Sequence, residues 1–368
     1  MKIDEPPTQR VAIVATTEYH GGAEIYIQRL KQQLEEKGYA VTLFGDLVGF
    51  DGESRSIGAG PKWGLRTLTV GLLSLPQERG RLLSALNSDQ PFAAFSLHFK
   101  REQIAYTRLL TKRARTVWVE HGTFPSGLFG IIIRPLYWLA SRKVSEIVCV
   151  SELVARSIAQ RASRSTPISV IESAVARPNP SDREATRAKY GVTTDARLCV
   201  FVGRLTARKR PQLAIEAALA ASAVILVAGD GPERARLESL YRNNPDVHLI
   251  GQTDDVSSLL SAADYHLWTS DGVGEGFPTV LLEASWHSVP TVAASDSGFA
   301  TMVKSAGGVV TEPDAEAMAV AILDDSEHGA SGASALAWAK QHTLSDWSTA
   351  HTISLGLPIG EGKTDGYA

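Results

Sequence analysis

The chain has 368 residues, of which 44% are hydrophobic and 7% aromatic, and a formal net charge of -3. This length is enough for two domains that each bury a core of their own. The composition is typical of a soluble globular protein. A nucleic-acid-binding protein needs a basic face or an aromatic stacking platform, so the near-neutral charge and scattered aromatic residues exclude nucleic acid as a partner.

Cysteine usage and apolar runs narrow the class further. Cys149 and Cys199 lie in apolar runs, so we expect two buried free thiols. No basic segment followed by a long apolar run opens the chain, so no secretory signal is predicted and the cytoplasm is the expected compartment. The longest apolar stretch, residues 127–133, is interrupted by Arg134 and Pro135 and is shorter than the ~20 residues that a spanning helix needs.

The first half of the chain alternates short apolar runs with helical periodicity. An apolar run at residues 10–15 precedes a helical pattern from Ala23 to Lys37, which Gly38 ends. Further strands are predicted at residues 39–44, 92–97, 116–120 and 146–150. The glycine-rich residues 45–65 are predicted to be loop. Such alternation predicts a parallel sheet with helices on both faces.

A second series of the same kind follows a proline-bearing polar stretch at residues 176–182. Its strands are predicted at residues 198–202, 223–228, 247–250, 265–269 and 290–293. A last helix is predicted from Leu344 to Ile353, before a tail without apolar periodicity. The predicted segments are a first domain at 1–177, a linker and start of the second domain at 178–196, a second domain at 197–342, a helix within 343–355 and a mobile tail at 356–368.

The segment Glu-Gly-Phe-Pro-Thr-Val-Leu-Leu-Glu from Glu275 to Glu283 is the most specific pattern in the chain. Pro278 suits the first turn of a helix, so Glu275 is expected in the loop before it and Glu283 on the helix itself. Free N–H groups at a helix start suit a diphosphate, and Glu283 is placed to accept hydrogen bonds from a ribose. The predicted donor-binding residues of this segment are Gly276, Phe277, Pro278, Thr279 and Glu283.

Sugar, diphosphate and ribose in a row form the layout of a nucleoside-diphosphate-sugar site. A simpler interpretation stays open for each of the two acids. Glu275 could be an exposed acid of a glycine-rich loop, and Glu283 could be a helix-face acid in a surface ion pair.

Basic residues follow the first strand of the second series. Gly203 lets the chain turn at the carboxyl end of that strand, where open α/β sheets bind ligands, and Arg204 and Lys209 lie on the turn. They are predicted to neutralise the charge of a departing diphosphate. The alternative is a solvated basic turn, because Arg208 and Arg210 lie beside them. No Asp-x-Asp motif occurs, so the usual carboxylate anchor for Mg²⁺ or Mn²⁺ is missing, and transfer without metal or cofactor is expected.

Glycine pairs mark two further loops. Gly21 and Gly22 follow the first strand and open a helix, where a backbone without Cβ can approach a phosphate or sugar; a plain loop is the alternative. This is not the dinucleotide fingerprint, because residues 16–20 fill the turn where that motif would begin. Gly229-Asp230-Gly231 is a weaker imitation that lacks the third glycine.

His121 follows another predicted strand and is a candidate for the active site, with a satisfied core histidine as the alternative. His98 is the second candidate, on the acceptor side. Glu120 is expected to orient His121 rather than act as a base.

A basic stretch precedes the longest apolar segment. Its basic residues are Lys100, Arg101, Arg108, Lys112, Arg113 and Arg115, against one acid, Glu102. One interpretation is that these basic residues form a solvated face of a helix. The other interpretation is peripheral contact with an anionic membrane surface next to residues 127–140, with Tyr137 and Trp138, which suits a lipid-linked acceptor.

The ordered motifs resemble those of the retaining glycosyltransferases of family 4, which have the two-domain GT-B architecture. The resemblance is strongest in the second half, in the blocks Val202–Pro211, Ala228–Pro232, Ala262–Asp264, Glu275–Glu283 and Val289–Val292. In the first half it depends on Gly21–Glu24 and His121–Gly122. Glu172–Ser173 stands where the family commonly has Asn-Gly, and Trp286–Ser288 replaces smaller residues.

The resemblance implies an α/β fold with two Rossmann-like doubly wound domains facing each other across a cleft, and a C-terminal helix that crosses back to the first domain. It implies transfer of a sugar from a donor such as a UDP- or GDP-sugar to a hydroxyl, with retention, in cell-surface glycan or glycolipid assembly. Glu275 would contact the sugar and support charge on the anomeric carbon, and His121 would contact the sugar near the reacting centre.

The acceptor is left as a glycan, a lipid-linked molecule or a small molecule. Two rival functions share these motifs. One is a sugar-nucleotide epimerase of the same architecture, and the other is a sugar-nucleotide-binding protein without turnover. The joint presence of Arg204, Lys209, Glu275 and Glu283 favours an enzyme.

Overall fold

The structure is a computed structural model that describes residues 9–17, 21–47, 50, 54–58, 64, 67–179, 181–324 and 328–359. The chain divides into two compact units. Unit 1 comprises Met1–Ser173 and Leu344–Ala368, and unit 2 comprises Ala174–Thr343. The boundaries predicted from the sequence lie at residues 177 and 342.

Unit 1 is built on a parallel seven-stranded sheet in the order β3-β2-β1-β4-β5-β6-β7. The strands are β1 (Arg10–Val14), β2 (Ala40–Phe44), β3 (Ser54–Arg55), β4 (Ala94–Leu97), β5 (Arg115–Glu120), β6 (Glu146–Cys149) and β7 (Ile168–Val170). The order of the strands reverses between β1 and β4. Loops after these two strands therefore diverge at the carboxyl edge of the sheet.

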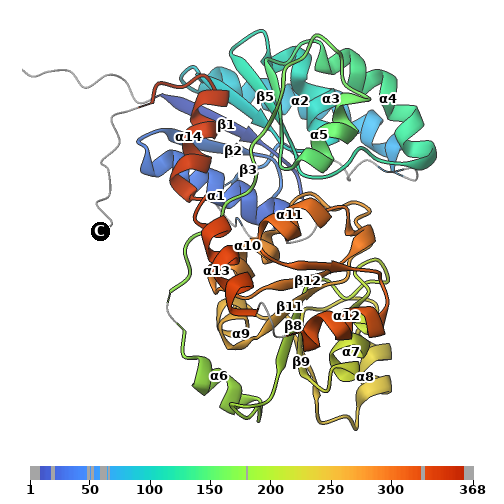
Figure 1. Cartoon of the computed structure of the whole chain (residues 1–368). Coiled ribbons are helices and arrows are strands. Elements are labelled where there is room, and N and C mark those ends of the chain that lie inside the picture. Colours follow the sequence, from blue (N-terminus) through green and yellow to red (C-terminus); the bar gives the residue numbers. More distant parts are fainter. Residues whose placement is uncertain are drawn as a thin grey trace, which may run out of the picture. The chain divides into compact units, whose positions relative to one another are not determined.

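Helices cover both faces of this sheet (Figure 1). They are α1 (Gly22–Glu36), α2 (Leu68–Ser88), α3 (Lys100–Leu110), α4 (Gly127–Ser141), α5 (Glu152–Ala159) and the C-terminal α14 (Leu344–Ser354). The terminal helix packs against α1, so the chain returns to its first unit, as the family resemblance implied.

Unit 2 has a parallel six-stranded sheet in the order β10-β9-β8-β11-β12-β13. Its strands are β8 (Leu198–Val202), β9 (Val224–Ala228), β10 (Val247–Gly251), β11 (Tyr265–Trp268), β12 (Thr291–Ala294) and β13 (Val309–Thr311). Its helices are α6 (Arg183–Lys189), α7 (Pro211–Ala220), α8 (Arg234–Tyr241), α9 (Val256–Ala262), α10 (Thr279–Trp286), the 3₁₀ turn η1 (Ser295–Ser297), α11 (Ala300–Ser305), α12 (Ala315–Leu323) and α13 (His328–Ala339).

The strands of unit 2 are apolar on both faces because helices cover both. On β8, Cys199 and Phe201 join the core with α7 and α12, and Leu198 and Val200 join the opposite core with α9 and α10. Full burial of one such side chain stabilises the fold by about 1.5 to 3 kcal/mol. This double coverage explains the continuous apolar runs that the sequence shows.

The structure corrects the sequence prediction at three short strands. β3 lies inside residues 45–65, which were predicted as loop, and β7 and β13 were not predicted at all. Cys149 and Cys199 are buried free thiols, as predicted. No described helix is long and apolar enough to span a bilayer. The predicted tail at 356–368 lies outside the described residues from residue 360 onward.

Candidate active site

The strand order of unit 2 reverses between β8 and β11, which are neighbours in the sheet. At such a reversal, the loops leaving the two strands diverge and open a crevice at the carboxyl edge. The loop after β8 carries Gly203, Arg204 and Lys209. The loop after β11 carries Glu275. The fold thus brings both predicted motifs to the same edge of the sheet.

Lys209 and Glu275 contact each other directly. The Lys209 ammonium Nζ lies 2.6 Å from Glu275 Oε1, and Ser270 Oγ donates a hydrogen bond of 2.6 Å to the same oxygen. The ammonium also lies 4.8 Å from the centre of the Trp268 ring. Both charged side chains are largely buried, with 26% of Lys209 and 14% of Glu275 exposed. The pair is therefore held in a defined position rather than solvated.

The other basic residues of the loop have different surroundings. Arg204 is exposed. Arg208 forms a loose surface pair with Asp271 at 3.4 Å. Arg210 donates to the Thr269 and Ser270 carbonyls at 2.5 and 2.9 Å, and to both carboxylate oxygens of Asp296 at 2.9 and 2.6 Å.

Arg210 therefore ties three loops together. It begins α7 in the left-handed conformation (φ 48°, ψ 52°) with Pro211 as the first helical residue. Its guanidinium also lowers the pKa of the Asp296 carboxyl, so this ion pair persists into acid. The Thr269 hydroxyl donates to the Lys209 carbonyl at 2.8 Å, which fixes the backbone that carries the ammonium.

Two glycines on the loop after β9 let it touch the loop after β8. Gly229 has φ +136°, and a Cβ there would lie 1.9 Å from the Gly203 carbonyl oxygen. Gly231 has φ +157°, and its Cβ would lie 2.4 Å from the Leu205 carbonyl oxygen. The Gly229-Asp230-Gly231 motif is thus explained by close backbone packing, without any ligand.

The start of α10 differs from its prediction by one residue. Pro278 is the cap rather than the first helical residue, and its angles (φ -79°, ψ 77°) form an inverse γ-turn in which Thr279 N–H donates to the Phe277 carbonyl at 2.9 Å. This bond occupies one of the N–H groups proposed for a diphosphate. Pro278 has no N–H to offer. Of the three residues whose amides were predicted to bind a diphosphate, Phe277 is therefore the one whose N–H the γ-turn does not use.

Glu283 lies on α10 and is partly buried, while Glu275 lies in the preceding loop, as predicted. Gly276 is also in that loop and is partly exposed. The two acids therefore lie in different settings: one is a loop carboxylate paired with Lys209, and the other is a carboxylate on a helix.

The predicted residues of unit 1 gather at its own carboxyl edge. His98 follows β4, His121 follows β5, and His98 Nδ1 lies 2.9 Å from His121 Nε2. His98 Nε2 lies 2.9 Å from Ser96 Oγ. The Tyr26 ring packs edge-on against His121 at 4.7 Å between ring centres.

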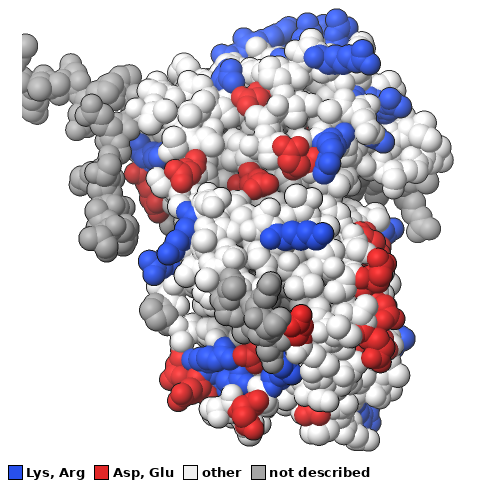
Figure 2. Space-filling view, viewed as in Figure 1, with Lys and Arg blue, Asp and Glu red and all other residues white. Residues whose placement is uncertain are grey.

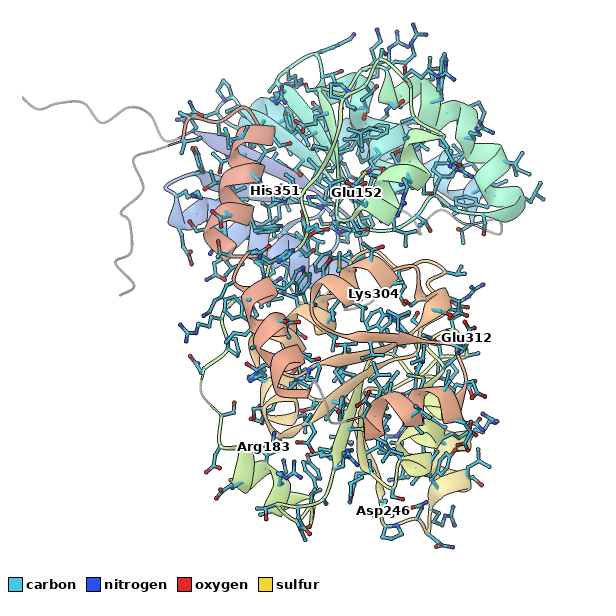
Figure 3. The ribbon with its side chains drawn as sticks, in the orientation of Figure 1. Glu152, Arg183, Asp246, Lys304, Glu312 and His351 are labelled. Carbon is cyan, nitrogen blue, oxygen red and sulfur yellow. The ribbon has the colours of Figure 1, made fainter. Side chains whose placement is uncertain are left out.

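A residue from the C-terminal helix joins the same cluster. His351 of α14, labelled in Figure 3, lies with Nε2 2.5 Å from the Tyr26 hydroxyl, and the Trp347 ring packs edge-on against Tyr26 at 5.0 Å. Burial is the main cause that lowers the pKa of His351 from 6.5 to about 3. Burial and then the nearby Lys100 charge lower the pKa of His121 to about 3. The cluster is neutral at neutral pH.

Glu120 does not orient His121. Its carboxylate pairs with Lys100 and accepts a hydrogen bond of 2.7 Å from the Tyr137 hydroxyl. Tyr137 is fully buried, so it is not part of any exposed surface. The prediction failed because Glu120, the last residue of β5, bonds to Lys100 and Tyr137, whereas His121 lies after the strand.

The basic stretch at residues 100–115 is not one solvated face. Arg101 is 3% exposed and bonds to the carboxylates of Glu78 and Glu102, while Lys100 is paired as described above. A buried guanidinium needs such partners to offset its loss of water. Arg108, Lys112, Arg113 and Arg115 are exposed.

Gly21 caps α1 in an extended conformation and Gly22 is its first residue. A Cβ on Gly22 would meet nothing within 4 Å, so the unit itself does not require glycine there. The space beside Gly22 remains open to a ligand. Gly21, Gly22 and His121 belong to unit 1, whereas Arg204, Lys209 and Glu275 belong to unit 2.

Two hollows of unit 2 lie away from these loops. One, of about 490 Å³, is lined by Arg197, Ser222, Asp264 and their neighbours, where β8, β9 and β11 begin. Another is lined by residues 239–246. Neither contains a predicted site residue, and strand starts are not where open α/β sheets bind ligands.

Two family descriptions match most of the chain. Residues 20–176 match "Glycosyltransferase Family 4" and residues 182–331 match "Glycosyl transferases group 1". The chain belongs to the family 4 glycosyltransferases. Among its relatives, D-inositol 3-phosphate glycosyltransferase of Mycobacterium tuberculosis is 30% identical over 136 residues. That match covers 34% of this chain and only 28% of the relative.

Solved structures resemble this family 4 chain over nearly its whole length. HepE of Anabaena in complex with UDP and glucose has a TM-score of 0.75 at 20% identity, covering 95% of this chain and 99% of HepE. Sucrose-phosphate synthase of Thermosynechococcus elongatus has a TM-score of 0.77 at 17% identity, covering 94% of this chain and 98% of the synthase. WaaG, a glycosyltransferase involved in lipopolysaccharide biosynthesis, has a TM-score of 0.69 at 19% identity, covering 96% of this chain and 100% of WaaG. These likenesses establish the GT-B fold.

Several residues that build these sites were not predicted from the sequence. Ser270 and Trp268 hold the Lys209–Glu275 pair, and Tyr26 and His351 complete the histidine cluster. The position of Ser270 directly after a predicted strand was a usable signal. No local signal connects Tyr26 with His351, because the contact depends on the return of the last helix.

Proposed function

We propose that this protein is a retaining glycosyltransferase that moves a sugar from a nucleoside-diphosphate sugar to an acceptor hydroxyl. The observation that carries the proposal is the Lys209–Glu275 pair at the carboxyl edge of unit 2, with the exposed Arg204 on the same loop. The family supports the reaction class. The complexes of HepE with UDP and with UDP-glucose support the donor class.

Lys209 gives the pair its chemical use. An ammonium has three donors, and one of them is directed at Glu275. The remaining donors can bind a diphosphate while the carboxylate stays attached. Lys209 would therefore neutralise the leaving diphosphate and at the same time place Glu275 beside the sugar–phosphate bond, with Arg204 as a second cation.

Glu275 is proposed to stabilise rather than to attack. Its Oε1 accepts from both the Lys209 ammonium and the Ser270 hydroxyl, and these bonds lower its nucleophilicity. Its charge would support the cationic anomeric carbon. Retention then follows from attack on the same face of the sugar, in which a diphosphate oxygen takes the acceptor proton and the sugar–phosphate bond breaks.

Glu283 on α10 is proposed to accept hydrogen bonds from the ribose, and Phe277 N–H to bind the diphosphate beside the helix start. Gly203, Gly276 and Thr279 would shape this pocket. Gly21, Gly22 and His121 are proposed to contact the donor from unit 1.

We propose that the cations replace a catalytic metal, because the sequence lacks Asp-x-Asp. Transfer should persist in excess chelator. If chelator abolishes transfer and Mg²⁺ restores it, this part of the proposal is wrong. The proposed setting is the cytoplasm, in the assembly of a cell-surface glycan or glycolipid.

The full chain, incubated with a panel of UDP- and GDP-sugars and hydroxyl acceptors, tests the function. The expected product is the α-linked glycoside from an α-linked donor, identified by NMR. An isomerised donor without transfer would indicate an epimerase. Donor binding in calorimetry without turnover on any acceptor would indicate a binding protein.

A further inference from the structure

Three polar side chains of unit 1 form a hydrogen-bonded chain at the carboxyl edge of its sheet. Ser96 belongs to β4, His98 follows β4, and His121 follows β5. Ser96 Oγ lies 2.9 Å from His98 Nε2, and His98 Nδ1 lies 2.9 Å from His121 Nε2. Ser96 is 1% exposed and His98 is 2% exposed, whereas His121 is partly exposed. The bonded groups therefore lead from the interior of unit 1 to a ring that a ligand can reach.

The two imidazole rings are joined end to end. Their planes differ by 19°, and their centres are 5.2 Å apart, much farther than the 2.9 Å between the bonded nitrogens. In this arrangement the N–H of one ring points along the lone pair of the other, which is the preferred geometry of a hydrogen bond. The rings of Tyr26 and Phe99, with centres 4.7 and 6.0 Å from that of His121, pack against it. His121 is thus fixed in orientation as well as in position.

Both histidines are neutral, so each ring has one N–H and one lone pair. Burial is the main cause that lowers the pKa of His98 well below its usual value. Burial and then the Lys100 charge lower the pKa of His121 to about 3. Charged side chains are numerous on the outer surface, as Figure 2 shows for one face of the molecule, but the three bonded groups carry no charge. Only one proton can lie between the two rings, and Ser96 decides which ring provides it.

The Ser96 hydroxyl selects one of two proton arrangements. Within the described part of the chain, Ser96 Oγ bonds only to His98 Nε2. If His98 Nε2 carried the proton, the serine hydroxyl would be a buried donor without an acceptor, which is costly. The hydroxyl therefore donates to Nε2, His98 Nδ1–H donates to His121 Nε2, and the proton of His121 is on Nδ1. No described residue bonds to that nitrogen, so its N–H is available to a ligand.

We propose that Ser96 and His98 are positioning residues that make His121 a hydrogen-bond donor through Nδ1. The lone pair of its Nε2 accepts the bond from His98, so His121 has no free lone pair with which to act as a base. A ring that is 2% exposed, with both nitrogens bonded, has no nitrogen left for a substrate, so His98 acts through His121. The ligand of the Nδ1–H group would be an oxygen of the transferred sugar, and this identity alone rests on the proposed function.

The tautomer can be measured without any substrate. In a long-range proton–nitrogen correlation spectrum of the full chain with isotopically labelled histidine, His121 and His98 should each show a protonated Nδ1 and an unprotonated Nε2. Signals that disappear in His121→Ala and His98→Asn assign the two rings. In Ser96→Ala each arrangement leaves one nitrogen of His98 unpaired, so a mixture of tautomers is expected. Ser257→Ala is the matched control, because Ser257 Oγ lies 3.0 Å from His287 Nε2 in unit 2, and it should leave the His121 signals unchanged.

Two replacements of His98 separate positioning from packing. His98→Asn keeps an amide N–H near the position of Nδ1, so it should retain kcat/KM within about threefold. His98→Leu has a similar volume but no donor, so it should lower kcat/KM by about tenfold or more. Thermal unfolding checks that both variants fold. Since His98 acts only through His121, His98→Leu should have no further effect on kcat/KM when His121 is already alanine.

The spectrum and the kinetics distinguish two kinds of failure. If the wild type transfers no sugar to any acceptor, the proposed function fails, and the spectrum still decides the inference. A wild-type His121 that is protonated on Nε2 would overturn the inference, and so would a folded His98→Leu variant with unchanged kcat/KM. Equal losses in His98→Asn and His98→Leu, which persist when His121 is alanine, would show that His98 serves only to pack the unit.

Discussion

Arginines on one short loop have opposite roles, although the sequence presents them as one basic cluster. Arg210 uses its guanidinium on two carbonyls and the carboxylate of Asp296, whereas Arg204 is exposed. The sequence could single out Arg204 and Lys209 from their position after a strand. It could not identify Arg210 as a clamp, because its partners lie about 60 and 86 residues away in the chain.

Substitution should separate these two arginines. Arg210→Ala leaves two carbonyls and a carboxylate with one partner fewer, so it should lower the free energy of unfolding by about 2 kcal/mol. Arg204→Ala should change stability by less than about 0.5 kcal/mol and lower kcat/KM. Urea unfolding and steady-state kinetics of the two variants measure both effects. Equal losses of stability would contradict the distinction.

The contact between Lys209 and Glu275 makes their effects interdependent. Lys209→Ala should cost about 2 to 4 kcal/mol of transition-state stabilisation, the range for a preorganised donor to an oxyanion. Since each residue positions the other, Lys209→Ala/Glu275→Gln should cost less than the sum of the single variants, by about 1 kcal/mol or more. The measurement is kcat/KM for all four proteins. Additive losses would mean that the pair does not act as one unit, and Arg208→Ala is the control with wild-type kinetics.

At the scale of elements, the predicted strands of both sheets are confirmed, because buried parallel strands leave continuous apolar runs in the sequence. β3, β7 and β13 escaped prediction since strands of two and three residues at sheet edges carry too little pattern. The loops between elements were the least predictable part. The γ-turn at Pro278 and the contact between the loops after β8 and β9 depend on backbone dihedral angles. The residue type restricts these angles but does not determine them.

Gly229 tests the contact between these two loops. Gly229→Ala would place a Cβ 1.9 Å from the Gly203 carbonyl oxygen at φ +136°, so we expect a loss of about 2 kcal/mol or more in stability and a displaced Arg204 loop. Gly80→Ala is the matched control, because Gly80 lies inside α2 with nothing within 4 Å of its Cβ position. It should be neutral or stabilise by up to about 1 kcal/mol. Thermal unfolding compares them, and a tolerated Gly229→Ala would contradict the packing.

At the scale of the whole molecule, the last helix completes the first unit. The sequence predicted this return only through the family resemblance, since α14 itself carries no motif. What the sequence could not show is that α14 brings His351 into contact with Tyr26, next to His98 and His121. This contact joins residues 325 positions apart. It makes the stability of unit 1 dependent on protonation.

The direction of that dependence follows from the lowered pKa values. His351 has a pKa of about 3 when folded and an ordinary value of 6.5 when unfolded, so both states are neutral above pH 6.5. Between these values only the unfolded chain binds the proton, so the stability present above pH 6.5 is lost as the pH falls toward 3. Burial also lowers the pKa of His98 well below its usual value, with the same sign. The slope is about 1.4 kcal/mol per pH unit for each such histidine.

Replacement of His351 should therefore flatten the pH profile of unit 1. From about pH 7 to pH 5, His351→Gln should lose about 2 kcal/mol less stability than the wild type, because glutamine can still bond to Tyr26 but does not titrate. Hydrogen exchange of β1 and β4 amides reports the opening of unit 1 alone. His248→Gln, on β10 of unit 2, is the control and should leave this profile unchanged. If His351→Gln and the wild type lose the same stability in acid, then His351 is already protonated in the folded protein, and the buried neutral cluster is not what links acid to the opening of unit 1.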